Sequence, residues 1–259
     1  MILTYETIHY IFHYLSNSLA EQDIAQIAEC QEKCFKRICS TLNIIYDHKI
    51  SYWLYSSPKI IGDLFFNGSP CNGLSITSAD DEDVGRKISL SGNTDNEFIV
   101  EPYSVHAVYE DKIKCIGAHE DTHIISAQLC EPRSTFLCEG LAMFMEGKWW
   151  CVDNKAWAKY YMVSGELFPT SELICFDEDD FHNVDSSKTY PVAGAWTEYV
   201  FEKYGADKYK QFYCARDYLR EAKEIFGDPL EQIREGFVSW LSRADISEDV
   251  YLSIKEKIL

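Results

Sequence analysis

The segment Ile116-Gly-Ala-His119-Glu-Asp-Thr-His123-Ile-Ile125 decides most of what this sequence predicts. It places two imidazoles four positions apart, and a carboxylate, Glu120, directly follows the first. Residues i and i+4 of a helix share one face, so both imidazoles can reach the same metal ion while Glu120 lies beside it. The spacing therefore predicts a metal site, and the surrounding sequence has to support it.

The sequence around the motif favours a helix of about residues 112–129. Ile113, Ile116 and Ile124 recur at roughly helical spacing, and Pro132 disfavours a helical residue before it. Much of the predicted helix surface is apolar, so we expect it to be buried at the centre of the fold. A buried helix suits a metal site whose water must be shielded from bulk solvent.

Zinc bound by two histidines needs a third protein ligand, and the next apolar segment supplies two candidates. This segment is Phe136-Leu-Cys-Glu139-Gly-Leu-Ala-Met-Phe-Met-Glu146. Glu139 and Glu146 are seven positions apart and share a helix face. Spacing alone leaves both of them eligible.

The two segments quoted above together resemble the gluzincin metallopeptidases, specifically the peptidase MA-like group. In that family the Glu of a Glu-Gly-Leu-Ala segment completes a His-His-Glu site. The resemblance implies that Glu139 is the third ligand of one zinc ion, with His119 and His123. Gly140 is consistent with a close approach of the backbone to the site, because glycine has no Cβ.

The resemblance extends to a third segment, Tyr190-Pro-Val-Ala-Gly-Ala-Trp196, which is similar to the downstream helix of the family. It therefore covers about residues 100–215, in three pieces in the expected order. One departure is Met143, which stands where thermolysin-like enzymes carry an Asp that supports the metal ligands. The Gly-x-Met-Glu-Asn sequence of aminopeptidases is absent, so recognition of a substrate amino terminus is not expected.

The predicted function is that of a zinc-dependent peptidase acting on a peptide or protein. Glu120 is expected to act as general base and then as general acid, because its neighbour His119 takes the metal. Tyr190 is the candidate donor to the oxyanion, although a Tyr in the core explains this residue equally well. Two alternatives stay open: a catalytically silent metal- or protein-binding regulatory module on the same fold, and an accidental motif whose histidines bind carbonyl groups.

The other histidines are predicted to be structural. His9 and His13 also have helical i, i+4 spacing in the expected first helix, but no carboxylate stands between them. A helix face with two partly exposed histidines is the simplest interpretation. His48, His106 and His182 are isolated in the sequence.

Cysteine usage and hydropathy predict a cytoplasmic protein. The 10 cysteines form no Cys-x-x-Cys pair, and Cys115, Cys130 and Cys138 in apolar segments suggest free buried thiols. No basic start followed by an apolar stretch indicates a signal peptide, and no apolar run of about 18 residues predicts a membrane span.

The charge balance limits the expected partners. The chain has 24 basic and 42 acidic residues and a net charge of −18, which disfavours nucleic acid and anionic membranes. Basic substrates are favoured instead. The acidic clusters 80–83 and 177–180 suggest solvated loops, since neither matches a calcium-binding loop.

The predicted fold is α+β and gluzincin-like, with a small mixed sheet packed on the motif helix and a mainly helical C-terminal lobe. We expect one metallopeptidase-like domain of residues 1–259, with a helix-and-sheet lobe at 1–130 and a helical lobe carrying the third ligand at 131–259. The first lobe is expected to be helical over residues 1–46 and to have strands near residues 49–55, 60–66, 73–77 and 97–108. An edge strand of such a sheet can hold an extended peptide.

Overall fold

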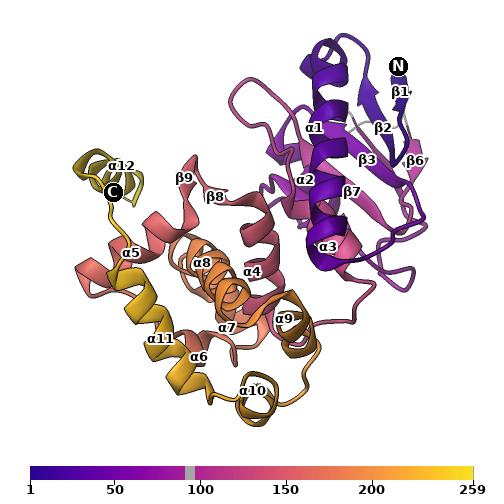
Figure 1. Ribbon diagram of the computed structural model, residues 1–259. Coiled ribbons are helices and arrows are strands. Elements are labelled where there is room, and N and C mark those ends of the chain that lie inside the picture. The colour runs from indigo at the N-terminus through magenta and orange to yellow at the C-terminus, as the bar shows by residue number, and fades with distance from the viewer. Residues whose placement is uncertain (91–96, 259) are drawn as a thin grey trace. The chain divides into compact units, whose positions relative to one another are not determined.

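The computed structural model describes residues 1–90 and 97–258 and is a mixture of helices and strands with a small mixed sheet (Figure 1). It divides into two compact units, Met1–Gln128 and Leu129–Leu259, and each is described by itself. The expected combination of α and β structure is therefore present.

The first unit is built on a five-stranded sheet with the strand order β1-β2-β3-β7-β4. The pairs β2–β3 and β3–β7 are parallel, whereas β1–β2 and β4–β7 are antiparallel. Its elements are β1 (Ile2–Glu6), β2 (Tyr10–Leu15), α1 (Leu19–Leu42), β3 (Ile50–Tyr55), α2 (Pro58–Phe65), β4 (Gly73–Ile76), β5 (Lys87–Ser89), β6 (Glu97–Ile99), β7 (Ser104–Val108) and α3 (His119–Ser126).

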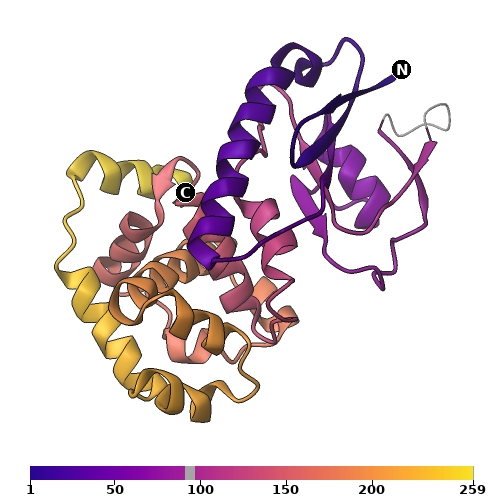
Figure 2. The same cartoon turned by 45° about the vertical axis from the view of Figure 1, so that its right-hand side comes forward.

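Helices cover both faces of this sheet. Figure 2 shows α1 on one side of the strands and α2 on the other. Alternate residues of β3 face opposite ways: the ring of Tyr52 contacts that of Tyr10, while Trp53 packs in one cluster with Ile61 of α2. The helix α3 contacts α1, β4 and β7. The motif helix therefore lies on the α1 side of the sheet.

Two predictions for the N-terminal region were wrong. Residues 1–16 form the antiparallel strands β1 and β2 instead of a helix, because Tyr10, Phe12 and Tyr14 alternate with less buried residues at period two. The predicted strand at 60–66 is helix α2, which Ser57 caps and in which Pro58 occupies the first turn. The helix expected after residue 16 is confirmed as α1.

The motif helix is also shorter than the predicted 112–129, because α3 begins at His119 and ends at Ser126. The residues before it form a turn after β7, in which the Cys115 N–H donates to the Val108 carbonyl at 2.8 Å. Gly117 then takes a φ of 147°, a backbone conformation that L side chains rarely adopt. The apolar residues before Gly117 therefore lie in this turn and not in the helix.

The second unit is mainly helical. Figure 1 shows α4 and α8 at its centre, with α5, α9 and α11 around them, and α8 contacts α4, α5, α9 and α11. Its elements are α4 (Thr135–Glu146), β8 (Lys148–Trp149), β9 (Val152–Asp153), α5 (Asn154–Ser164), α6 (Thr170–Leu173), α7 (Glu178–Asn183), α8 (Ser186–Tyr204), α9 (Ala206–Tyr213), α10 (Tyr218–Phe226), α11 (Leu230–Ser242) and α12 (Glu248–Ile258). None of the described helices has the length and apolar character that a membrane span needs.

The prediction of a free thiol was wrong for one cysteine. Cys130 forms a disulfide with Cys214, which closes a chain segment with a sequence separation of 84 residues within the second unit. Cys115 and Cys138 lie outside this disulfide and are only partly buried. The argument from reduced cysteines therefore no longer holds for Cys130, and a cytoplasmic location stays a prediction.

Candidate metal centre

The two histidines of the motif converge, as their spacing predicts. His119 is the first residue of α3 and His123 lies one turn later, and their Nε2 atoms are 3.3 Å apart. Both side chains are partly exposed. The pair therefore presents two imidazole nitrogens toward one point on an accessible face of the helix.

Asp121, between the two histidines, points to the opposite, buried side of α3. It is fully buried, and its Oδ2 accepts hydrogen bonds from the Tyr10 hydroxyl at 2.5 Å and from Gln31 Nε2 at 2.9 Å. Burial, followed by the charge of Asp121, raises the pKa of Tyr10 well above its ordinary value. Tyr10 therefore stays a neutral donor and stabilises the buried carboxylate.

Gln31 also fixes the start of α3. Its Oε1 accepts from the Gly117 N–H at 2.8 Å, and its Nε2 donates to the Gly117 carbonyl at 2.9 Å. Gly117 stands two residues before His119, so this amide positions the backbone that leads into the metal-binding face. Gln31 is itself fully buried on α1.

Sequence reasoning missed this supporting network. Gln31 and Tyr10 lie 90 and 111 positions away from Asp121 in the chain, so no local pattern connects them. Asp121 itself gave a signal, because a carboxylate two positions after His119 faces away from the histidines on a helix. A partner for it in the core was to be expected.

Glu120 lies against strand β4. A Cβ atom added at Gly73 would come within 2.9 Å of Glu120 Oε1, so the missing side chain of Gly73 leaves room for this carboxylate. β4 pairs with β7 and is the last strand in the sheet order. The predicted general base therefore lies beside the terminal strand of the sheet.

Glu139 completes a possible ligand set. Together with His119 and His123 it forms the His-His-Glu group of the described residues. These three residues could hold a metal ion, and the donor set of two imidazole nitrogens and one carboxylate oxygen fits zinc. Glu146, the second candidate, does not belong to this group of described residues.

The glycine after Glu139 has a different role from the one expected. A Cβ atom on Gly140 would lie 2.8 Å from Thr197 Oγ1 and 2.9 Å from the Ala193 carbonyl oxygen, both on α8. Its close approach is therefore to α8 rather than to the metal ligands. Ser134 begins α4 by accepting from the Leu137 N–H.

Tyr190 lies half-buried in the first half of α8. Its ring stacks on Trp149 at a centroid distance of 5.2 Å and packs against Phe181 at 5.7 Å. This packing fits the alternative of a core tyrosine, and it leaves the predicted role as oxyanion donor as a proposal.

The histidines outside the motif are held by neighbouring side chains. His9 Nδ1 lies 2.7 Å from Glu32, and His13 stacks on Trp53 from within β2. They therefore do not share a helix face, contrary to the prediction. His106 is fully buried in β7, and burial, followed by the charges of Arg86 and His13, lowers its pKa to about 3.

No protein-family model matches this chain, and no curated protein sequence matches it. The resemblance to gluzincins therefore rests on the motif residues alone.

Proposed function

We propose that this protein is a zinc-dependent peptidase. The observation that carries the proposal is the convergence of the His119 and His123 Nε2 atoms, 3.3 Å apart on α3, with the carboxylate of Glu120 directly following the first histidine. Zinc, when bound, would supply a Lewis acid for the scissile carbonyl group. Side chains of the protein would transfer the proton, hold the substrate and donate to the oxyanion.

Glu120 is the proposed proton carrier. It directly follows His119 in α3 and is partly exposed, so its carboxylate is accessible to a water molecule near the ligand set. It would take the proton of the attacking water and pass it to the leaving amine. The glycine at position 73 keeps the space that this side chain occupies.

Strand β4 is the proposed site for the substrate backbone. Its terminal position in the sheet leaves one edge able to accept an extended peptide by strand addition. Gly73, the first residue of β4, lies beside the Glu120 carboxylate. A peptide bond aligned along β4 would therefore pass close to the proposed base.

Tyr190 is retained as the proposed oxyanion donor, since a phenol can donate to a developing negative charge. Its support is the resemblance of the Tyr190 segment to the family helix and its partial exposure. A Tyr190→Phe variant keeps the ring stack on Trp149 and removes only the hydroxyl group. A fall in kcat with an unchanged KM would support the role.

The test combines metal content with cleavage. Protein purified without added metal or chelator should contain about one zinc per chain by elemental mass spectrometry, and His123→Ala should lose it. Glu120→Gln should keep the metal and lose cleavage of a peptide library by about a hundredfold or more. His48→Gln, at an exposed position in the first unit, is the matched control and should keep both.

Two results would contradict the proposal. Wild-type protein that neither contains nor takes up zinc would exclude the metal site. Metal retention with no measurable cleavage in wild type, and no change in Glu120→Gln, would favour the silent binding module.

A further inference from the structure

A cavity of about 400 Å³ in the second unit is lined by two aromatic rings and three acidic side chains. It lies where the end of α4 and the beginning of α5 meet α8, and both of these helices contact α8. The lining residues are Phe144, Gly147, Asp153, Asn154, Gly194, Glu198, Phe201 and Glu202. All of its polar side chains are carboxylates or an amide.

None of the three carboxylates forms an ion pair within the part of the chain that the structure describes. The ion pairs found there include none of Asp153, Glu198 and Glu202. Glu202 Oε2 accepts from Trp240 Nε1 at 2.7 Å, and Asp153 Oδ1 accepts from the Lys155 N–H at 2.8 Å. Two of the carboxylates thus accept hydrogen bonds from uncharged donors.

The pKa of Glu198 reflects its burial together with the charges of its neighbours. Burial is the largest cause of its raised pKa, and the charges of Asp153 and Glu202 raise it further against the opposing effect of Lys155. The Lys155 ammonium lies over the ring of Trp240, with Nζ 3.6 Å from the ring centroid. A cation entering the pocket would relieve the repulsion among the carboxylates.

Asn154 supplies an independent indication of a missing donor. It is 3% exposed, and its Nδ2 donates to the Met143 carbonyl at 2.7 Å, which fixes the orientation of the amide. Its Oδ1 is buried and has no hydrogen-bond partner. Gly194 makes room for this amide, because a Cβ atom there would lie 2.6 Å from Nδ2. A buried acceptor of this kind calls for a hydrogen-bond donor.

The aromatic lining indicates an organic cation. The rings of Phe144 and Phe201 lie 4.7 Å apart between centroids and are partly exposed. Such rings attract a guanidinium or ammonium group through their faces and contact the methylene chain that carries it. A bare metal ion would gain nothing from them.

The spacing of the acidic groups also disfavours a metal ion. Among the described residues, no group of metal-binding side chains within ligand distance of one another includes the pocket carboxylates. A guanidinium, with five N–H donors in a planar fork, can instead reach acceptors that are too widely separated for one metal ion.

We propose that this pocket binds the basic side chain of a peptide, arginine or lysine, between the carboxylates of Asp153, Glu198 and Glu202 and the rings of Phe144 and Phe201. The site goes beyond the proposed peptidase function and does not rest on it, because every lining residue belongs to the second unit. It also gives a local cause for a preference for basic partners, which the net charge of −18 only suggests.

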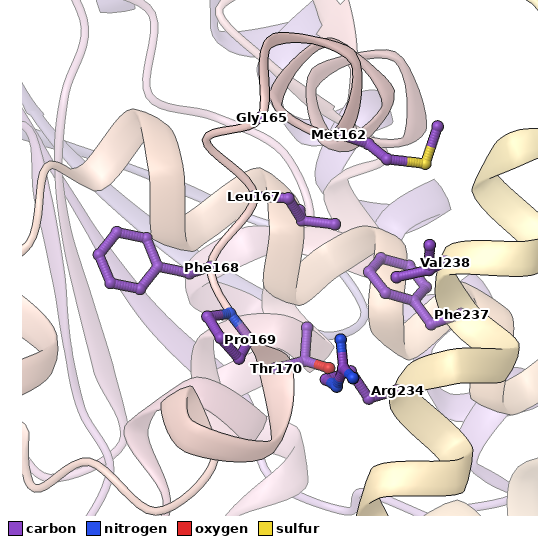
Figure 3. A pocket seen from close by; sticks show the side chains of 9 residues that line it. All are labelled: Met162, Gly165, Leu167, Phe168, Pro169, Thr170, Arg234, Phe237 and Val238. Carbon is purple, nitrogen blue, oxygen red and sulfur yellow. The ribbon is translucent and has the colours of Figure 1, made fainter.

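A second pocket in this unit does not offer comparable chemistry. Figure 3 shows its mainly apolar lining of Met162, Leu167, Phe168, Pro169, Phe237 and Val238, with Arg234 at one edge beside Thr170. Arg234 is already ion-paired with Glu231, so its charge is compensated within the chain. We therefore assign no ligand class to this smaller cavity of about 230 Å³.

The test is calorimetric titration of the full chain with the capped tripeptide Ac-Ala-Arg-Ala-NH2. The matched probe is the same peptide with citrulline, which keeps the shape of arginine but carries no charge. We expect binding of the arginine peptide and at least tenfold weaker binding of the citrulline peptide. Glu198→Gln should weaken binding of the arginine peptide at least tenfold, and Glu248→Gln, exposed on α12, should leave it unchanged.

A second variant protects the test against misfolding. Phe201→Leu keeps an apolar wall and removes the aromatic face, so it should weaken binding severalfold with an unchanged circular dichroism spectrum. Equal binding of the two peptides, no binding at millimolar concentration, or an unchanged affinity in Glu198→Gln would overturn the proposal. Tighter binding of spermidine than of the arginine peptide, or calcium binding that Glu198→Gln abolishes, would overturn the assignment to a peptide side chain. None of these readouts depends on zinc or on cleavage.

Discussion

The buried imidazole of His106 should make the stability of this protein depend on pH in a defined way. Its ring is fully buried, with Nδ1 2.8 Å from the Tyr55 hydroxyl and Nε2 3.1 Å from the Ser104 hydroxyl. Trp53 and Phe65 pack against the ring. This environment accommodates a neutral imidazole and penalises the charged form, so the pKa falls from 6.5 to about 3.

The sign of the effect follows from proton binding in the two states. Between pH 6.5 and pH 3 the unfolded chain carries a proton at His106 and the folded chain does not. The contribution to stability is therefore complete above pH 6.5 and is lost as the pH falls toward 3. Each pKa unit corresponds to about 1.4 kcal/mol, so the loss amounts to about 2 kcal/mol at pH 5 and at most about 5 kcal/mol at pH 3.

The assay is urea unfolding of wild type and of His106→Asn between pH 4 and pH 7.5. The asparagine variant should be less stable at pH 7 because it leaves a cavity, but its stability should fall by about 2 kcal/mol less between pH 7 and pH 5. Comparing the two proteins cancels the contributions of the other titrating groups, and His48→Gln, at an exposed position, should follow wild type. Parallel pH profiles for wild type and His106→Asn would refute the reasoning.

Three further predictions concern the metal centre and the second unit. Asp121→Asn weakens two buried charge-assisted hydrogen bonds and should lower the free energy of unfolding by about 2–4 kcal/mol, whereas the exposed Asp111→Asn should change it little, as measured by urea unfolding. Glu139→Gln should sharply reduce zinc content by elemental analysis and Glu146→Gln should not; equal losses would reject the ligand assignment. Cys130→Ser should lower the free energy of unfolding by about 3 kcal/mol under oxidising conditions and should have little effect in the presence of a reductant, because the disulfide closes a long loop.

The parts of the metal centre that the sequence predicts are those set by helix geometry. The convergence of His119 and His123 needs only a spacing of four residues within a helix, and α3 provides it. Spacing could not choose between Glu139 and Glu146, because both lie on one face of α4. The choice between them depends on tertiary packing, which no local sequence pattern encodes.

The errors in the fold have a common physical cause. Ile8, Ile11, Phe12 and Leu15 fit a helical period by coincidence, while Tyr10, Phe12 and Tyr14 fit the period of two that the strand adopts. A short apolar segment can fit both the helical period and the strand period. Contacts with other parts of the fold then decide between helix and strand. Here β2 forms backbone hydrogen bonds with β1 on one side and with β3 on the other. A helix at this position could not form them.

The limits of sequence reasoning are clearest for the acidic groups of the second unit. Glu198 and Glu202 lie four positions apart on α8, Asp153 precedes α5, and in the sequence all three resemble an ordinary solvated acidic surface. Their significance depends on two things that only the fold provides: the enclosure by Phe144 and Phe201 and the absence of a cation from the pocket lining. Charge counting alone predicts a general preference for basic partners and gives it no location.

The helix α3 carries the candidate metal-binding histidines on one face and buried core residues on the opposite face. His119 and His123 present their nitrogens on the partly exposed face, while Asp121 and Ile125 are fully buried on the other. A carboxylate in the core is costly unless donors surround it, and Gln31 and Tyr10 provide those donors. Because these donors bind at one register only, they also determine how the helix is rotated about its axis. The buried face therefore fixes where the histidines point, and substitutions there should disturb the metal site by rotating the helix rather than by removing a ligand.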